Sequence, residues 1–303
     1  MTNVYTPHPS YAGSCVVNGT QIYCQSANIS FESKPTFYNH TVGLIESYLG
    51  IGSSGLADAI NASQIQKKYY RYSPILPKAS ISGLLTYDTA VALLDLAKWA
   101  GPIPSGSAGS GGGIHVGLVA WHTGAQQSLH NAFMQSFTLS LNAGEPLSFS
   151  SEFVGMSAGS AGSAGSAGGS IKLLTWDTCP ITVTGTYAGA GAHFNGTSAG
   201  ISGFSLTVNN PVTPIYTANQ PNLYPKDLRV GVQDVTGSVT TYGENSFFQG
   251  AGSIKLHLGS SGGGKDYIFQ VAFEPPNDKV SSNSMYLSTT NFVAFGSSGS
   301  AWS

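Results

Sequence analysis

The sequence has little charge. Of its 303 residues only 9% are Asp, Glu, Lys or Arg, against about 25% in an ordinary globular protein. The net charge is −2 and only 12 residues are Lys or Arg, which argues against nonspecific binding to nucleic-acid phosphates. A surface so poor in charge favours burial of much of it against other subunits, although the many Ser, Thr and Gly residues also supply polarity.

Cysteine is scarce too. The three cysteines, Cys15, Cys24 and Cys179, are an odd number and none lies in a C-x-x-C spacing. This pattern predicts neither a disulfide framework nor a metal site. Cys15 and Cys24 are close enough in sequence to pair across a hairpin, but free, half-buried thiols are the simpler interpretation. We therefore expect no metal and no cofactor.

Long apolar runs are missing. No run approaches the roughly 20 residues of a membrane-spanning helix, and Met1–Ser10 lacks the basic and apolar segments of a signal peptide. The sequence thus predicts a soluble protein that is made inside the cell and has no membrane partner.

The motifs of the large enzyme classes are missing as well. G-x-S-x-G, H-E-x-x-H, P-loop and Rossmann patterns do not occur in a supporting context. His115, His122 and His130 fall on different expected strands and turns. Glu145 lies in an expected turn, which argues against a glycosidase pair with Glu152. We expect no catalytic residues and no enzyme activity.

What the sequence does contain is the alternation of apolar and small polar residues that is typical of β-strands. The longest such stretch, Tyr224–Tyr242, predicts one long strand. A helix is expected over 89–100, because Asp88 can accept its first N–H groups and a Gly-Pro pair follows it; a weaker helical pattern covers 56–68. The apolar side chains expected to pack this flanking helix are Val91, Leu93, Leu94 and Ala97.

The strand patterns of the two halves resemble each other. Three pairs of segments occur in the same order: Ile29–Tyr38 with Phe204–Tyr216, Tyr72–Tyr87 with Tyr224–Tyr242, and Ser150–Met156 with Thr289–Phe295. Aligned on Pro35 and Pro211, Gly83 and Gly237, and Phe153 and Phe292, the offsets decrease along the chain. A duplication whose first copy carries longer loops explains this, although Phe137–Asn142 matches Phe204–Asn209 equally well.

Composition places the boundaries of the two expected copies. The Ser-Ala-Gly tract is typical of a flexible linker or an engineered loop replacement, and Gly299–Ser303 resembles the start of a purification tag. We expect an N-terminal arm over 1–13, a first domain over 14–156 with a long loop at 39–70, a linker over 157–170, a second domain over 171–296 and a tag remnant over 297–303.

A resemblance to the tail tube subunits of long-tailed (siphovirus-like) bacteriophages is found in Gly203–Asn210 followed by Lys226–Thr240. The expected hairpin Phe137–Phe153 has a similar strand pattern. The resemblance covers most of 14–296 through diffuse strand patterns. It implies a mainly β fold of two tandem tail-tube-type domains, each a β-barrel or sandwich, with a flanking α-helix. Family rings are hexameric, so a homotrimer of fused domains would form a pseudo-hexamer; a ring of six chains is the alternative.

The resemblance also implies a function. Stacked rings would form a virion tail tube that conducts double-stranded DNA into the host, with the tape measure and tail terminator proteins as partners. Small, never positive side chains on the expected strands would let DNA pass without counterion-release affinity. The candidate lumen or ring-interface positions are Ser80, Ser82, Thr86, Asp234, Thr236, Ser238 and Thr240.

A carbohydrate-binding or adhesin module is the alternative function. It would place aromatic side chains as a sugar-stacking platform on a β-sandwich, and it predicts a monomer with an exposed aromatic patch. The tail tube interpretation predicts rings with buried aromatics. The aromatic residues concerned are Tyr69, Tyr70, Tyr72, Trp99, Trp121 and Trp176.

Overall fold

The expected mainly β fold is confirmed by the computed structural model. Its described residues form a 15-stranded sheet, two two-stranded sheets, one α-helix and a 3-10 turn. None of the described helices is long and apolar enough to cross a membrane. The structure describes residues 13–18, 20–33, 36–38, 69–71, 74–99, 114–118, 126–161, 172–188, 200–217, 223–242, 247–260, 263–275, 277–279 and 287–295.

A first group of eight strands forms one part of the large sheet. Its strands pair in the order β7-β6-β1-β2-β5-β9-β8. The chain leads directly from β7 into β8. The strands are β1 (Gly13–Val17), β2 (Thr20–Ser33), β5 (Ile75–Leu84), β6 (Ile114–Leu118), β7 (Gln126–His130), β8 (Phe133–Asn142), β9 (Ser148–Val154) and β10 (Ser157–Ala161), which pairs with β7.

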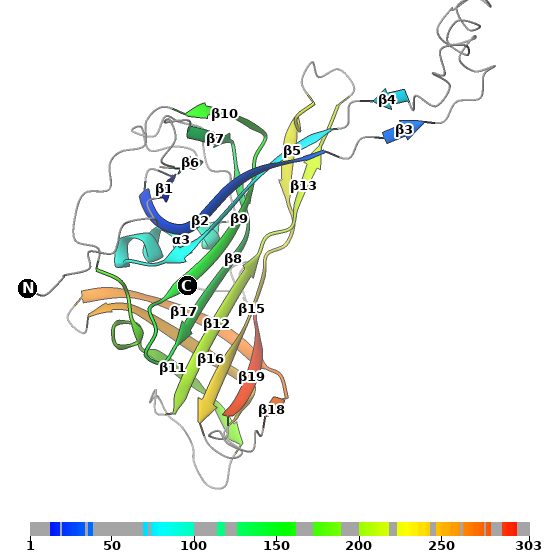
Figure 1. The fold of residues 1–303 in the computed structure, drawn as a ribbon. Coiled ribbons are helices and arrows are strands. Elements are labelled where there is room, and N and C mark those ends of the chain that lie inside the picture. The colour runs from blue at the N-terminus through cyan, green and yellow to red at the C-terminus, as the bar shows by residue number, and fades with distance from the viewer. Residues whose placement is uncertain are drawn as a thin grey trace, which may run out of the picture.

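A second group continues the same sheet. β12 pairs with β8 of the first group, and the order from there is β12-β15-β19-β17-β16-β11, with β18 against β19. Figure 1 shows these strands running across the molecule side by side with those of the first group. The strands are β11 (Ile181–Ala188), β12 (Ile201–Asn209), β15 (Asp234–Tyr242), β16 (Phe247–Ser260), β17 (Gly263–Phe273), β18 (Asn277–Lys279) and β19 (Leu287–Ala294).

The two groups share one order of pairing. β2-β5-β9 in the first corresponds to β12-β15-β19 in the second, and β1 pairs with β6 as β11 pairs with β16. If Phe153 is equivalent to Phe292, the register makes Ala79, and not Gly83, equivalent to Gly237. The sequence alignment at Gly83 was displaced by an even number of residues, which a period-two pattern cannot detect.

The prediction of one long strand over Tyr224–Tyr242 is wrong. The structure divides it into β14 (Asp227–Val230), which pairs with β13 (Val212–Ile215), and β15. Between them the Gln233 amide donates 2.8 Å to the Ala97 carbonyl oxygen at the end of the helix, and Val232 is 88% exposed. Tertiary hydrogen bonding to the helix therefore ends one strand and starts another. Strand β13 lies at one end of the sheet in Figure 1, and the pair β3 (Thr36–Tyr38) and β4 (Tyr69–Arg71) is drawn beyond it in this view.

Helix α3 (Tyr87–Trp99) packs on the apolar side of the sheet. Leu93, Leu94 and Ala97 are buried in the shared hydrophobic core, and Val91 is partly buried against it. The helix starts earlier than the sequence suggests. The Thr86 backbone N–H donates to Thr89 Oγ1, and the Thr86 carbonyl accepts from the Ala90 N–H, so Thr86 rather than Asp88 caps the helix.

The structure can be compared with several other sequence predictions. The first five residues of the Ser-Ala-Gly tract form β10 instead of a linker, and they pair with β7. The three cysteines are buried rather than half buried, none of them is in a disulfide, and Cys15 Sγ lies 2.8 Å from Cys24 Sγ. The expected helix over 56–68, most of the arm and the tag remnant lie outside the described residues. The 3-10 turn covers Trp176–Thr178.

The close packing of β15 generates the first prediction. A Cβ added at Gly237 would overlap the Ser205 carbonyl oxygen and the Phe292 ring, so Gly237→Ala should lower the free energy of unfolding by about 1–3 kcal/mol. Urea denaturation of the free subunit measures it. Gly263→Ala is the matched control, since nothing lies within 4 Å of its added Cβ. Equal midpoints for the two variants would contradict the packing described.

Candidate functional site

One face of the large sheet carries small polar side chains across both groups of strands. Residues directly opposite each other in antiparallel strands share a face, so the register defines rows across the sheet. The middle row crosses seven strands, β2, β5, β9, β8, β12, β15 and β19. Its residues are Ser26, Ser82, Ser150, Thr138, Thr207, Thr236 and Val293.

The rows on either side have the same character. One contains Asn28, Ser80, Glu152, Ser136, Asn209 and Asp234. The other contains Leu84, Ser148, Ser140, Ser205, Ser238 and Asn291. We call the surface made by these three rows and the adjoining pair Thr240 and Thr289 the hydroxyl face.

Hydroxyl groups on this face bond to one another across strands. Ser205 Oγ lies 2.8 Å from Ser238 Oγ, and Thr240 Oγ1 lies 3.1 Å from Thr289 Oγ1. At the junction of the two groups, Thr138 Oγ1 of β8 lies 3.3 Å from Thr207 Oγ1 of β12. These contacts pair hydroxyl groups of neighbouring strands, including the two strands at the junction of the groups.

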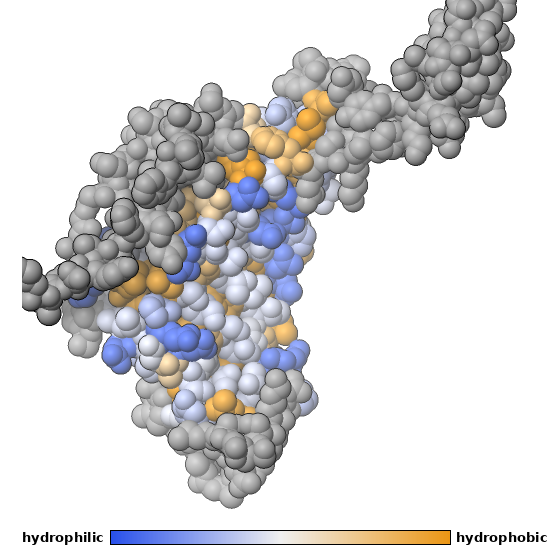
Figure 2. Space-filling view, in the orientation of Figure 1, coloured by the Kyte–Doolittle hydropathy of each residue, from blue (hydrophilic) through white to orange (hydrophobic). Residues whose placement is uncertain are grey.

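Charge is sparse on the hydroxyl face. Among its residues the charged side chains are Glu152 and Asp234, and Lys78 lies in the next row beyond them. Figure 2 shows a largely pale surface over the central strands, with hydrophilic residues in separate groups. A face with isolated charges and no cluster of Lys or Arg has little counterion-release affinity for a phosphate backbone.

The structure brings most of the sequence-predicted positions together. Ser80, Ser82, Thr236, Ser238 and Thr240 lie on the hydroxyl face, and Asp234 ends one of its rows. Thr86 does not join them, because it lies beyond the end of β5 with its hydroxyl 2.9 Å from that of Thr89. Sequence reasoning missed the contributions of β2, β8, β9 and β12, although the same alternation of Ser and Thr marks them.

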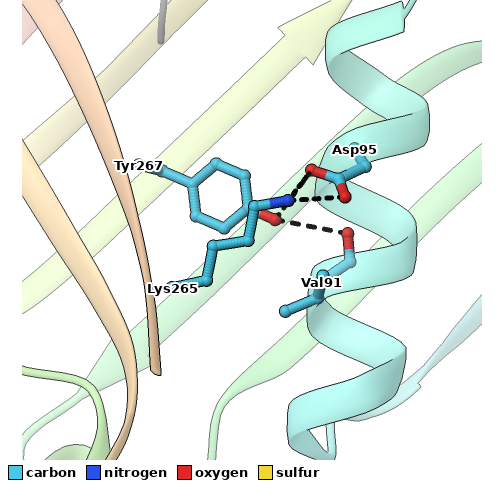
Figure 3. Close-up of polar contacts among 4 residues, drawn as sticks. All are labelled: Val91, Asp95, Lys265 and Tyr267. Atoms are coloured by element: carbon cyan, nitrogen blue, oxygen red, sulfur yellow. Dashed lines mark hydrogen bonds and ion pairs between the residues drawn. The ribbon is translucent and has the colours of Figure 1, made fainter. Parts of the chain in front are cut away.

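The opposite face of the sheet is apolar, and α3 joins the two groups there. Asp95 of α3 accepts hydrogen bonds from Lys265 Nζ at 2.6 Å and from the Tyr267 hydroxyl at 3.0 Å (Figure 3). The Tyr267 hydroxyl also lies 3.3 Å from the Val91 carbonyl oxygen. We call these contacts of Asp95, Lys265 and Tyr267 the helix clasp. Burial, with the Asp95 carboxylate, raises the pKa of Tyr267 above its ordinary value, so the phenol stays a donor.

The C-terminal end of α3 makes a second link. Gln233 Nε2, which donates to Ala97, also lies 3.0 Å from Asn210 Oδ1. Asn210 is fully buried, and its Nδ2 donates 3.1 Å to the Met134 carbonyl oxygen of β8. The junction of β8 and β12 is thus held by sheet pairing on one face and by the helix on the other.

A charged cluster lies on β16 and β17, away from this junction. Asp266 accepts from Lys255 at 2.7 Å and from His257 at 2.6 Å, and these hydrogen bonds hold the pKa of Asp266 below its usual value. Within the described part of the chain no group of three potential ligands is placed to hold a metal ion.

The residues weighed for catalysis and sugar binding are not brought together. Glu145 accepts from Asn142 in the turn after β8, whereas Glu152 lies on the hydroxyl face. His130 bonds to Ser128, while His122 lies outside the described residues. Of the six aromatic residues of the alternative function, only Trp176 has a described side chain, and it packs partly buried against the core.

The helix clasp gives the second prediction. Tyr267→Phe removes a buried donor and should lower the free energy of unfolding by about 1 kcal/mol or more. Lys265→Met keeps the apolar stem and loses an ion pair whose side chains are 41% and 46% exposed, which contributes about 0–1 kcal/mol. Urea denaturation should rank Tyr267→Phe as the more damaging change. The reverse order would show that the exposed ion pair holds the helix.

Comparison with known proteins now identifies the family. A search of curated proteins found no match to the chain. The family model described as phage tail tube protein matches residues 35–294, which begin just after β2 and run to the end of β19. The match covers well over half of the chain, and the chain therefore belongs to the phage tail tube protein family.

Proposed function

We propose that the protein assembles into stacked rings that form the tail tube of a long-tailed, siphovirus-like bacteriophage, and that the tube conducts the viral DNA into the host. Membership of the family establishes the coarser statement: the protein is a structural component of the virion tail that assembles with itself and other tail proteins, and it is not an enzyme.

The observation that carries the proposal is the continuity of the hydroxyl face. It crosses seven strands and both groups without a break, because β8 and β12 pair directly. Short neutral side chains present no bulk and little charge to a passing phosphate backbone. We infer that this face lines the lumen of the tube, with the core and α3 on the side away from the DNA.

The repeated pairing order supports two tube domains in one chain, over 14–156 and 171–296. Each domain contributes corresponding strands to the same sheet, β2-β5-β9 in the first and β12-β15-β19 in the second. A chain with two such domains would fill two of six positions in a ring. Three chains would then form a homotrimeric pseudo-hexamer; six chains in a ring remain the alternative to be tested.

The remaining parts of the proposal follow from this role. The chain would be made in the host cytoplasm and join the virion as the tail assembles. Its neighbours there would be the tape measure protein inside the growing tube and the tail terminator at its end. DNA would pass without specific binding.

Assembly is the test of this function. Negative-stain electron microscopy beside light scattering should show rings or tubes with a central hole wide enough for duplex DNA. A ring mass three times that of the 31.3 kDa chain supports the homotrimer. A six-chain mass would replace the pseudo-hexamer by a larger ring. A stable 31.3 kDa monomer at high concentration would contradict self-assembly and return attention to glycan binding.

A further inference from the structure

The junction inside the chain has a defined register. β8 pairs with β12 so that Leu139 lies opposite Leu206 and Thr138 opposite Thr207. At this junction the first group contributes β8, which also pairs with β9, and the second group contributes β12, which also pairs with β15. The second group contains a strand equivalent to β8, and the first group contains a strand equivalent to β12.

β18 occupies in the second group the place of β8. In the first group Thr138 lies opposite Ser150 of β9, and in the second Asn277 lies opposite Thr289 of β19. Ser150 and Thr289 are equivalent when Phe153 is matched with Phe292. The residues of β18, Asn277, Asp278 and Lys279, therefore correspond to Thr138, Leu139 and Ser140.

β2 occupies in the first group the place of β12. Ile29 lies opposite Ala79, as Leu206 lies opposite Gly237, so Ile29 corresponds to Leu206. β5 covers one edge of β2, and β1 covers Thr20–Cys24 of the other. Among the strands that the structure describes, none pairs with the second edge of β2 beyond Cys24, or with the edge of β18 that faces away from β19.

We propose that β18 of one chain pairs with the open edge of β2 in the next chain, in the register that β8 and β12 show inside the chain. Lys279 then lies opposite Asn28 of the next chain, Asp278 opposite Ile29, and Asn277 opposite Ser30. The partner is a second copy of this chain, and the inference rests on the proposed assembly into rings. An open strand edge is a template for such pairing.

The shift in register from strand to strand is consistent with a sheet that this contact closes into a ring. Starting at Asn28, the row reaches β12 at Asn209, whereas the residue equivalent to Asn28 is Ser205. The row thus advances four residues while it crosses the four strands β2, β5, β9 and β8. One residue of shift per strand corresponds to a strand tilt of about 35°, which lies at the lower end of the range for closed sheets.

The proposed contact is head-to-tail, because different edges of the chain meet. Repeating it generates either a closed ring or an open helix, and closure depends on the rotation between neighbours. If the contact copies the internal junction, every step around the ring is the same, whether it lies within a chain or between chains. The rows of the hydroxyl face then continue from one chain to the next, and each contact places Lys279 in the row of Asn28.

Cysteine pairs test the register, with the same four substitutions recombined as their own control. Asn28→Cys with Lys279→Cys, and Ser30→Cys with Asn277→Cys, place the new thiols directly opposite each other. Asn28→Cys with Asn277→Cys, and Ser30→Cys with Lys279→Cys, place them diagonally. Mild oxidation of assembled rings should give disulfide-linked dimers and trimers at least about fivefold more from the opposed pairs, because disulfide formation depends steeply on Cα separation.

The outcomes separate this inference from the proposed function. Single-cysteine variants give the background from Cys15, Cys24 and Cys179, which are buried. Rings seen by electron microscopy whose opposed pairs do not cross-link above the diagonal pairs would overturn the register and leave the tail tube function standing. A wild-type chain that forms no rings would overturn the proposed function, and the contact with it.

Discussion

The antiparallel pairing of β8 with β12 is the interaction on which the rest of the structure depends. It joins two groups of strands with the same pairing order into one sheet, and it brings the Thr138 and Thr207 hydroxyls together at the seam. Without it each group would present an open strand edge and a short polar face. With it, one chain presents a continuous surface, and the apolar side chains of both groups meet in one core.

Helix α3 secures this junction from the apolar side. It belongs in sequence to the first group, yet its Asp95 binds Lys265 and Tyr267 of the second. The corresponding connection of the second group, between Tyr242 and Phe247, has four residues and no length for such a helix. Helix α3 thus reinforces the junction within the chain from the side opposite the hydroxyl face.

Sequence patterns predicted the strand content and the polar face but not the register. The alternation of Ser and Thr located Ser80, Ser82, Thr236 and Ser238, since small hydroxyl residues at period two mark one face of a strand. That same periodicity made Gly83 and Ala79 indistinguishable as partners for Gly237. The break before β15 and the role of Thr86 arise from hydrogen bonds to distant or capping groups, Gln233 to Ala97 and Thr86 to Thr89, which alternation does not encode.

The central claim is that the hydroxyl face surrounds the path of the DNA. A cryo-electron microscopy map of assembled tubes measures this directly, because it shows which face of the sheet borders the central channel. We expect Ser82, Ser150, Thr138, Thr207 and Thr236 to face the channel, with α3 on the outer side of the sheet. A map in which this row faces outward, or is buried between stacked rings, would contradict the account.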